Sequence, residues 1–174
     1  MPTTIHLERL IVCAENLYSG VSIELATGVR AQLLGNKLVI TENGTVVFHM
    51  KVIVHGTHLD LDYPRTTDGH EGRGWARLGL LLALRYGMHA GCTTAAAATQ
   101  LEPGSYSFWV AGNLQYSVHS NLQQSIVKIM LWINANIPQP TLVGTSVMII
   151  RDRVSGSTES KKPEGRKRSN SYNG

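Results

Sequence analysis

Six side chains suited to binding a divalent metal occur within one polar stretch of the chain. They are His55, His58, Asp60, Asp62, His70 and Glu71. Imidazole and carboxylate groups are established zinc ligands, and a strand that runs into a loop is a common place to find them. The residue types therefore indicate either a metal-dependent hydrolase or a polar strand edge that resists pairing with other sheets.

The spacing of these residues decides between the two interpretations. A histidine pair at i and i+3 suits a helix, whereas Leu59 and Leu61 alternate with Asp60 and Asp62 as they would in a strand. Both aspartates would then lie on the outer face of that strand. We therefore expect no metal and no cofactor, and we keep a hydrolase that uses His55, His58, Asp60 and Asp62 as an alternative.

A second set of residues is cationic and lies at the C-terminal end. From residue 151 onward the chain holds seven Lys or Arg and three acids, a net charge of +4 that equals the net charge of the whole chain. Residues 1–150 hold nine basic and nine acidic residues and are therefore neutral. The seven basic residues are Arg151, Arg153, Lys161, Lys162, Arg166, Lys167 and Arg168.

Basic clusters of this kind bind anionic surfaces. Phosphate backbones are bound with release of counter-ions, and the anionic cytoplasmic leaflet attracts each nearby basic residue by about 1 kcal/mol. A split basic cluster is also typical of a nuclear import signal. Ser169 and Ser171 each follow an arginine by three residues, which predicts phosphorylation that would cancel most of the +4 charge.

The sequence lacks the motifs of common enzyme classes. It contains no glycine-rich phosphate loop, no nucleophile elbow and no thiol pair. Cys13 and Cys92 lie far apart and follow no ligand spacing, which indicates reduced thiols, with Cys92 as a small core residue. The first residues do not form a secretory signal. We therefore expect a non-catalytic protein without a small-molecule substrate.

The element that must organise the chain is the apolar segment 75–88. Its Leu, Ala, Arg and Met residues are strong helix formers, and Gly87 and Gly91 suit a left-handed cap at its end. Apolar side chains surround the helix on every side except at Arg77 and Arg85, which predicts a buried core helix. A helix of this length extends about 21 Å and is too short to cross a bilayer core of roughly 30 Å.

Alternating apolar residues and turn signals predict a β-meander before this helix. Strands are expected at 21–25, 29–34, 37–41 and 45–55, with Asn43-Gly44 as a hairpin turn. In the longest strand we expect one face to hold Val46, Phe48, Met50, Val52 and Val54. The more mixed opposite face would hold Val47, His49, Lys51, Ile53 and His55.

The remaining segments give weaker patterns. Residues 5–12 fit a strand or a short helix equally well, and 56–74 reads as a long polar loop. Residues 105–118 predict a hairpin around Gly112-Asn113. A second helix is expected from Ser120 to the prolines at 138 and 140, and a last strand at 141–150.

This order of elements predicts an α+β domain with a mainly antiparallel sheet packed with two helices. The expected compact body covers residues 1–153. Residues 154–174 are expected to form a flexible, disordered basic tail, because their composition cannot bury a core.

The order of elements also resembles that of the short matrix proteins of plant-infecting rhabdoviruses. The resemblance rests on the strand 46–54, the polar loop, the helix 75–88, and the hairpin and helix up to Pro138, and it covers residues 45–150. The chain differs in carrying its basic arm at the C-terminus instead of the N-terminus. It also lacks a proline-rich late-budding motif, which fits assembly on internal membranes.

The resemblance implies a viral structural protein that self-associates, condenses a helical nucleocapsid and bridges it to membrane during virion assembly and budding. Its expected partners are further copies of itself, the nucleocapsid or RNA, and an anionic membrane surface to which it binds peripherally. Its expected locations are the virion, the host cytoplasm and the cytoplasmic face of membranes, with a nuclear pool if the tail acts in import. The main alternative is a soluble nucleic-acid-binding protein, such as a silencing suppressor.

Overall fold

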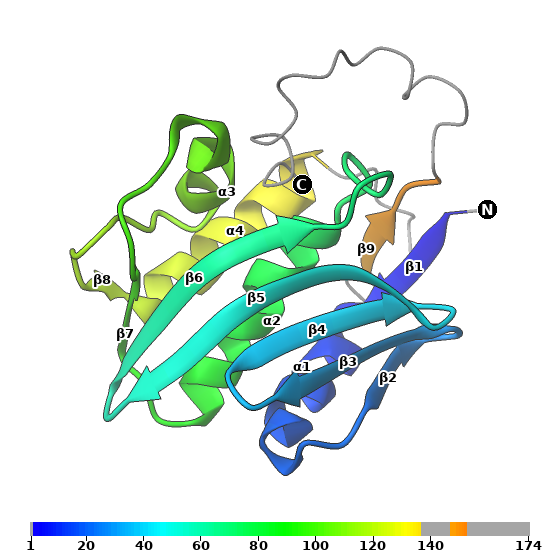
Figure 1. Cartoon of the computed structure of the whole chain (residues 1–174), viewed down its shortest axis with the longest axis horizontal. Helices are drawn as coiled ribbons and strands as arrows, with labels where there is room; N and C mark the ends of the chain where they lie inside the picture. Colours follow the sequence, from blue (N-terminus) through cyan, green and yellow to red (C-terminus); the bar gives the residue numbers. More distant parts are fainter. Residues whose placement is uncertain (1, 137–146, 153–174) are drawn as a thin grey trace.

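The computed structural model describes residues 2–136 and 147–152, without the side chains of 134–136. Its architecture is α+β, as the sequence predicts. A seven-stranded, mostly antiparallel sheet carries helices on one face, and a separate two-stranded sheet lies at one end (Figure 1). The opposite face of the large sheet is turned away from the helices, and we call it the open face.

The chain alternates irregularly between strands and helices. The strands are β1 (Thr3–His6), β2 (Ile23–Ala26), β3 (Val29–Leu34), β4 (Lys37–Glu42), β5 (Thr45–His55), β6 (His58–Thr66), β7 (Thr94–Ala97), β8 (Ser120–Asn121) and β9 (Val147–Ile150). The α-helices are α1 (Leu7–Asn16), α2 (Trp75–His89), α3 (Tyr106–Ala111) and α4 (Leu122–Asn136). Two short 3₁₀ turns are η1 (Leu17–Ser19) and η2 (Pro103–Ser105).

The large sheet has the strand order β2-β3-β4-β5-β6-β7-β8, and the small sheet pairs β1 with β9. Every neighbouring pair is antiparallel except β6 and β7, which α2 connects. The ambiguous residues 5–12 divide between β1 and α1. The meander was predicted almost to the residue, because turn glycines separate its strands. At Asn43 and Gly44 both φ angles are positive, as a two-residue hairpin turn requires.

A β-bulge corrects the predicted faces of β5. Ile40 pairs with Phe48, but the next residue, Thr41, pairs with Val46, so that Val47 is an extra residue in its strand. An extra residue turns the following side chains to the other face. As a result Val46 is 38% exposed and Val47 is fully buried, the reverse of the predicted assignment. From Phe48 onward the predicted alternation holds.

Two further segments differ from the predictions. The expected polar loop 56–74 contains the nine-residue strand β6, because Leu59 and Leu61 supply enough apolar surface to pair with β5. The expected strand at 105–110 is instead the helix α3, and no hairpin forms there. Gly112 and Asn113 follow this helix, and the Leu114 amide donates to the Trp109 carbonyl at 3.0 Å, a pattern that ends helices.

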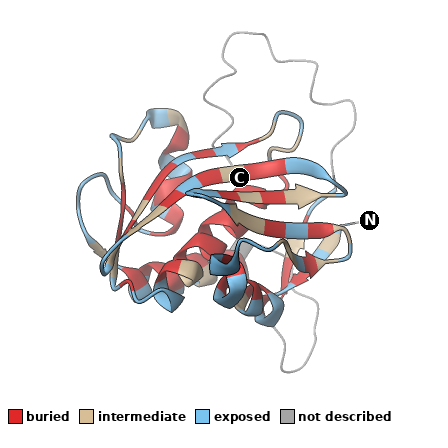
Figure 2. Ribbon diagram, turned by 60° about the horizontal axis from the view of Figure 1, so that its bottom comes forward, coloured by how far each residue is buried: buried red, intermediate tan, exposed pale blue. Residues whose placement is uncertain are grey.

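The core is built around α2, as predicted. Figure 2 shows that the buried residues concentrate between the helices and the sheet, and every residue from Trp75 to Leu84 is buried. The helix ends in a Schellman motif: the Gly91 amide donates to Met88 O, and the Cys92 amide donates to Gly87 O. None of the helices in the described ranges is long and apolar enough to span a membrane.

A buried arginine fixes the end of the described chain against the sheet. The Arg73 guanidinium donates to both carboxylate oxygens of Glu42, at 2.9 and 3.2 Å, and its Nε donates to Arg151 O at 2.7 Å. Arg151 is thereby held beside the end of β4. The predicted boundary at residue 153, the tail and most of the predicted last strand (141–146) lie outside the described residues.

Candidate anion-binding face of the sheet

The segment that first suggested metal chemistry forms a hydrogen-bonded cluster at one end of β5 and β6. Asp60 accepts from both neighbouring imidazoles: its Oδ2 lies 3.1 Å from His55 Nε2, and its Oδ1 lies 2.9 Å from His58 Nε2. The other ring nitrogen of His58, Nδ1, lies 2.7 Å from the Thr94 hydroxyl. The His119 ring stacks on the His58 ring, with 3.7 Å between their centroids. We call these five residues the His–Asp cluster.

The other proposed metal donors lie outside this cluster. Asp62 accepts from Thr99 Oγ1 at 2.8 Å and from the Tyr63 amide at 3.0 Å. His70 contacts Arg73, and Glu71 accepts from the Gly69 amide at 2.9 Å. Within residues 2–136 and 147–152, no group of three or more such side chains is arranged to hold a metal ion. The described residues therefore provide no set of metal ligands for the hydrolase alternative.

The order hydroxyl, imidazole, carboxylate at Thr94, His58 and Asp60 is the order used in nucleophilic catalysis. A hydrolytic site also needs a cavity for its substrate. Two cavities occur elsewhere: one of about 430 Å³ between helices, and one of about 630 Å³ between the β1–α1 segment and β2. Neither is lined by a residue of the His–Asp cluster.

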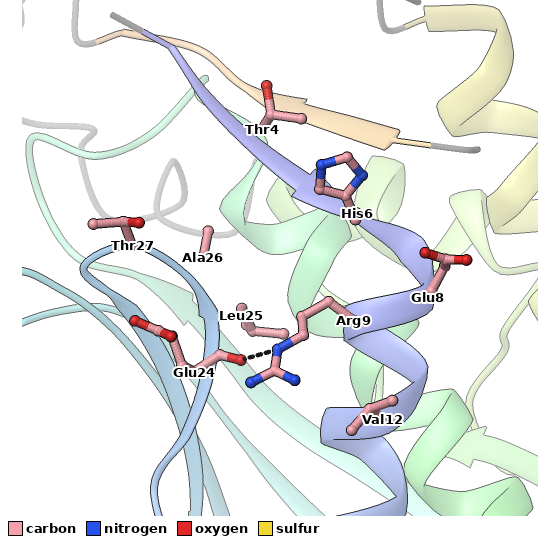
Figure 3. A pocket seen from close by; sticks show the side chains of 9 residues that line it. All are labelled: Thr4, His6, Glu8, Arg9, Val12, Glu24, Leu25, Ala26 and Thr27. Atoms are coloured by element: carbon pink, nitrogen blue, oxygen red, sulfur yellow. Dashed lines mark hydrogen bonds between the residues drawn. The ribbon is translucent and has the colours of Figure 1, made fainter. Parts of the chain in front are cut away.

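The larger cavity lies at the edge of the large sheet (Figure 3). There the Arg9 side chain crosses from α1 and donates from Nε to the Glu24 carbonyl at 2.9 Å, so that a side chain occupies a hydrogen-bonding position on the free edge of β2. Covering an edge strand in this way hinders pairing with another chain. We interpret this cavity as part of the edge protection.

The two cysteines are structural. Cys13 and Cys92 are free and buried in the core, as expected for Cys92 from the sequence. Burial raises the pKa of the Cys13 thiol to about 12 and also raises the pKa of Cys92. Both thiols are therefore protonated at neutral pH and unsuited to nucleophilic chemistry.

Of the predicted basic site residues, Arg151 is described and exposed. Arg153, Lys161, Lys162, Arg166, Lys167, Arg168, Ser169 and Ser171 lie outside the described residues. The described body nevertheless carries cationic residues of its own, on the open face of the sheet. Lys37 on β4, His49 and Lys51 on β5, and Arg65 on β6 form what we call the cationic strip.

The sheet register brings these four side chains together. Lys37 is directly opposite Lys51, and His49 is directly opposite Arg65. Leu38 and Met50, next to the lysines along each strand, are buried in the core, so the lysines point to the open face. Directly opposed like charges destabilise a sheet. The strip is therefore an unfavourable arrangement for the fold by itself.

His49 responds to the positive potential at this face. Its pKa lies below the ordinary value of 6.5, first because partial burial disfavours the charged ring, and then because Lys37 and Arg65 repel it. At neutral pH the ring is uncharged between two cations. An anion bound there would favour its protonation.

Carboxylates neutralise the strip only in part. Asp62 is opposite Lys51, but it is only 8% exposed and is bound to Thr99 and Tyr63. Asp68 is 3.8 Å from Arg65, and its side chain is 85% exposed. Among the described residues, neither Lys37 nor Lys51 forms an ion pair. This face can therefore accept an anionic partner.

Sequence reasoning missed the cationic strip for a specific reason. A hairpin centred on Asn43-Gly44 without a bulge would pair Lys37 with residue 50, and the bulge at Val47 moves it opposite Lys51. The sequence signal was present in the mixed face of β5. That signal did not indicate which residues of β4 and β6 lie beside it, because the pairing between strands cannot be deduced from the sequence of one strand.

Comparisons with protein-family models, with curated proteins and with solved structures give no match for this chain.

Proposed function

We propose that this chain is a non-enzymatic structural protein of the matrix type, which associates with itself and connects a nucleocapsid to an anionic membrane surface. The observation that carries the proposal is the cationic strip, where Lys37 and Lys51 oppose each other without ion-pair partners among the described residues. The basic C-terminal segment adds a second cationic region, whereas residues 1–150, which include the strip, have no net charge. Both regions suit phosphate-bearing partners.

Two cationic regions suit a bridging role better than one. A protein that joins a nucleic-acid assembly to a lipid surface needs contacts with both, and each contact gains from the proximity that the other provides. Neither of the two cavities described above is lined by a residue of the strip, and a strip that extends over three strands suits an extended polyanion better than a small molecule. Arg151, the first residue of the basic segment, is held beside the end of β4 through Arg73, which also binds Glu42.

The experiment that tests this proposal is co-sedimentation of the full chain with vesicles and with single-stranded RNA. Vesicles of phosphatidylcholine alone are compared with vesicles containing phosphatidylserine. We expect binding to the anionic vesicles and to RNA, both weakening as salt rises. The variant Lys37→Gln/Lys51→Gln should reduce the slope of log affinity against log salt for single-stranded RNA by about 1.4, or about 0.7 for each lysine.

Lys128→Gln is the matched control, because it removes one exposed charge from α4 on the helical side of the molecule. Its RNA affinity should match that of the wild type more closely than either Lys37→Gln or Lys51→Gln alone. Binding to RNA without binding to anionic vesicles would favour the soluble nucleic-acid-binding alternative, which the cationic strip also supports. Binding to neither would refute both.

A further inference from the structure

The helical side of the molecule carries a groove that is separate from the cationic strip. It has a volume of about 430 Å³ and lies between α1, α2 and α4. Leu7 and Ile11 of α1 and Met130 of α4 line it, together with Leu81 of α2. A groove lined by apolar side chains from three helices suits an apolar partner.

An exposed apolar ridge lies directly beside this groove. Val127 and Leu131 of α4 are 53% and 63% exposed, and they lie one turn apart on the same side of the helix. Met130, which lines the groove, lies three residues after Val127 and is therefore its neighbour on the surface of α4. Ridge and groove are therefore neighbours on one surface. Contiguous exposed apolar side chains of this kind mark interaction sites.

The groove also contains one charge of each sign. Glu8 of α1 is exposed and Arg85 of α2 is half-buried, and both line it. Neither residue is ion-paired with any other residue that the structure describes. In a two-fold pair every contact occurs twice, so an arrangement that sets Glu8 of one copy against Arg85 of the other also sets Arg85 of the first against Glu8 of the second. The surface thus carries an apolar ridge, an apolar groove and one charge of each sign that is unpaired among the described residues, which are the features that pairing with a second copy would use.

We propose that a second copy of this chain docks on this surface, with the Val127–Leu131 ridge of each copy in the groove of the other, about a two-fold axis. The inference rests on the self-association in the proposed function and deepens it by naming the interface. An anionic lipid is a poorer occupant, because Glu8 would repel its headgroup while Arg85 attracts it. A two-fold pair satisfies both charges.

The position of the groove gives such a dimer a useful geometry. On α2, Gly79 and Gly87 pack against Phe48 and Leu59 of the sheet, and Leu81 lies about 200° round the helix from Gly79. The groove is therefore on the side of α2 opposite the sheet, and Figure 1 shows that α1, α2 and α4 lie together on one face of that sheet. Dimerisation there leaves both cationic strips exposed on the two outer faces, so one dimer can hold two polyanionic partners.

Sedimentation velocity of the full chain over a concentration series tests the interface. We expect a wild-type dimer, with Leu131→Glu, Glu8→Arg and Arg85→Glu each weakening dimerisation by about tenfold or more. The double variant Glu8→Arg/Arg85→Glu should recover most of the loss, because it exchanges both charges. Glu15→Arg, an exposed charge reversal on α1 that does not line the groove, is the control.

Each other outcome has a definite meaning. A dimer that survives Leu131→Glu, or a double variant no tighter than the two single variants, overturns the proposed interface. A monomeric wild type overturns it as well, and if vesicle binding then falls on Leu131→Glu, the groove belongs to lipid. Thermal melts of every variant separate lost pairing from lost folding. Vesicle and RNA binding of the same variants tests the proposed function independently, because the strip lies on the other face.

Discussion

At the scale of the residue, our proposal gives the opposed Lys37 and Lys51 an unfavourable effect on folding and a favourable one on binding. Their opposition across β4 and β5 costs stability, by about 0.2–1 kcal/mol for directly opposed like charges. The same proximity strengthens the attraction of the open face for phosphate groups. A substitution that stabilises the fold while weakening anion binding therefore identifies a binding residue and not a structural one.

Lys37→Gln is the substitution that separates these effects. It removes a charge that lowers the pKa of His49, so the His49 pKa should rise toward its ordinary value of 6.5 while RNA affinity falls. Ring proton shifts in an NMR titration measure the pKa, and denaturant melts should show a small gain in stability. Lys128→Gln should leave the His49 pKa unchanged. An unaltered His49 pKa in Lys37→Gln would mean that the charge of Lys37 does not repel the His49 ring.

The pH dependence of stability follows from the direction of the same pKa shift. Above about pH 6.5 His49 is neutral in both folded and unfolded chains and contributes nothing. As the pH falls below 6.5 the unfolded chain binds the proton first, because the folded pKa is lowered, and stability is lost until the folded pKa is passed. His49→Gln should lose less stability than the wild type over this window in denaturant melts. Parallel profiles would argue against a lowered pKa.

The orientation and pairing of individual residues were also the hardest features to predict from the sequence. The faces of β5 were right from Phe48 onward and reversed at Val46 and Val47, because one extra residue in the strand changes which side chains point inward. Nothing in the apolar sequence Val46-Val47-Phe48 marks the position of the bulge. The pairing of Lys37 with Lys51 depends on that bulge and was hidden with it.

At the scale of the element, α2 was predictable because both of its ends and its whole surface carry signals. Leu82 is fully buried, so Leu82→Asp would place a carboxylate in the core at a cost of several kcal/mol. A cost of that size exhausts a typical margin of stability, and we expect loss of the cooperative melt by circular dichroism. Met88→Asp, on the same helix at a 36% exposed position, should melt nearly as the wild type does. Normal melting of Leu82→Asp would mean that α2 is not a core element.

Gly79 of α2 allows the helix to approach β5. A Cβ there would overlap the Phe48 ring, so Gly79→Ala should destabilise by about 1–3 kcal/mol from overpacking, offset by about 1 kcal/mol of better helix propensity. Repeating the substitution in a Phe48→Leu background tests whether the Phe48 ring causes the loss of stability, because the smaller Leu side chain leaves room for the added Cβ. We expect Gly79→Ala to cost less there, and an equal cost in both backgrounds would exclude the ring as the cause.

Elements with ambiguous signals were the ones predicted wrongly. Gly112-Asn113 suits a hairpin turn, but positive φ at Asn113 serves equally to end α3. The segment that contains β6 looked like a loop because its polar residues outnumber its apolar ones. Pairing with β5 and packing of Leu59 and Leu61 into the core decide its structure, and such long-range contacts are not visible in the local sequence.

At the scale of the whole molecule, the sheet face and the helix face have separate roles in our proposals. The strip lies on the open face and the groove on the opposite one, so binding and self-association need not compete. The sequence predicted the α+β body, because its hairpins and core helix are local features. It did not predict either surface, since each is assembled from elements far apart in the chain.

The basic C-terminal segment also acts at the scale of the whole molecule, because its charges would add to those of the body in attracting an anionic surface. Replacing Lys161, Lys162, Arg166, Lys167 and Arg168 by Gln should weaken binding to phosphatidylserine vesicles by orders of magnitude, with about 1 kcal/mol per basic residue as an upper limit. Glu159 and Glu164 reduce that effect. The melting temperature should stay unchanged if these residues lie outside the folded body.

The salt dependence of vesicle binding distinguishes the contribution of the C-terminal segment from that of the body. Raising salt from about 50 to 200 mM should weaken wild-type binding far more than binding of the five-residue variant, because screening acts on charges that the variant lacks. Ser169→Glu/Ser171→Glu should reproduce part of the loss, since each adds negative charge to the cluster. Equal salt sensitivity of wild type and variant would assign the membrane contact to the body. The Lys37→Gln/Lys51→Gln variant should then show weaker salt dependence than the wild type, because it lacks the charges of the body that salt would screen.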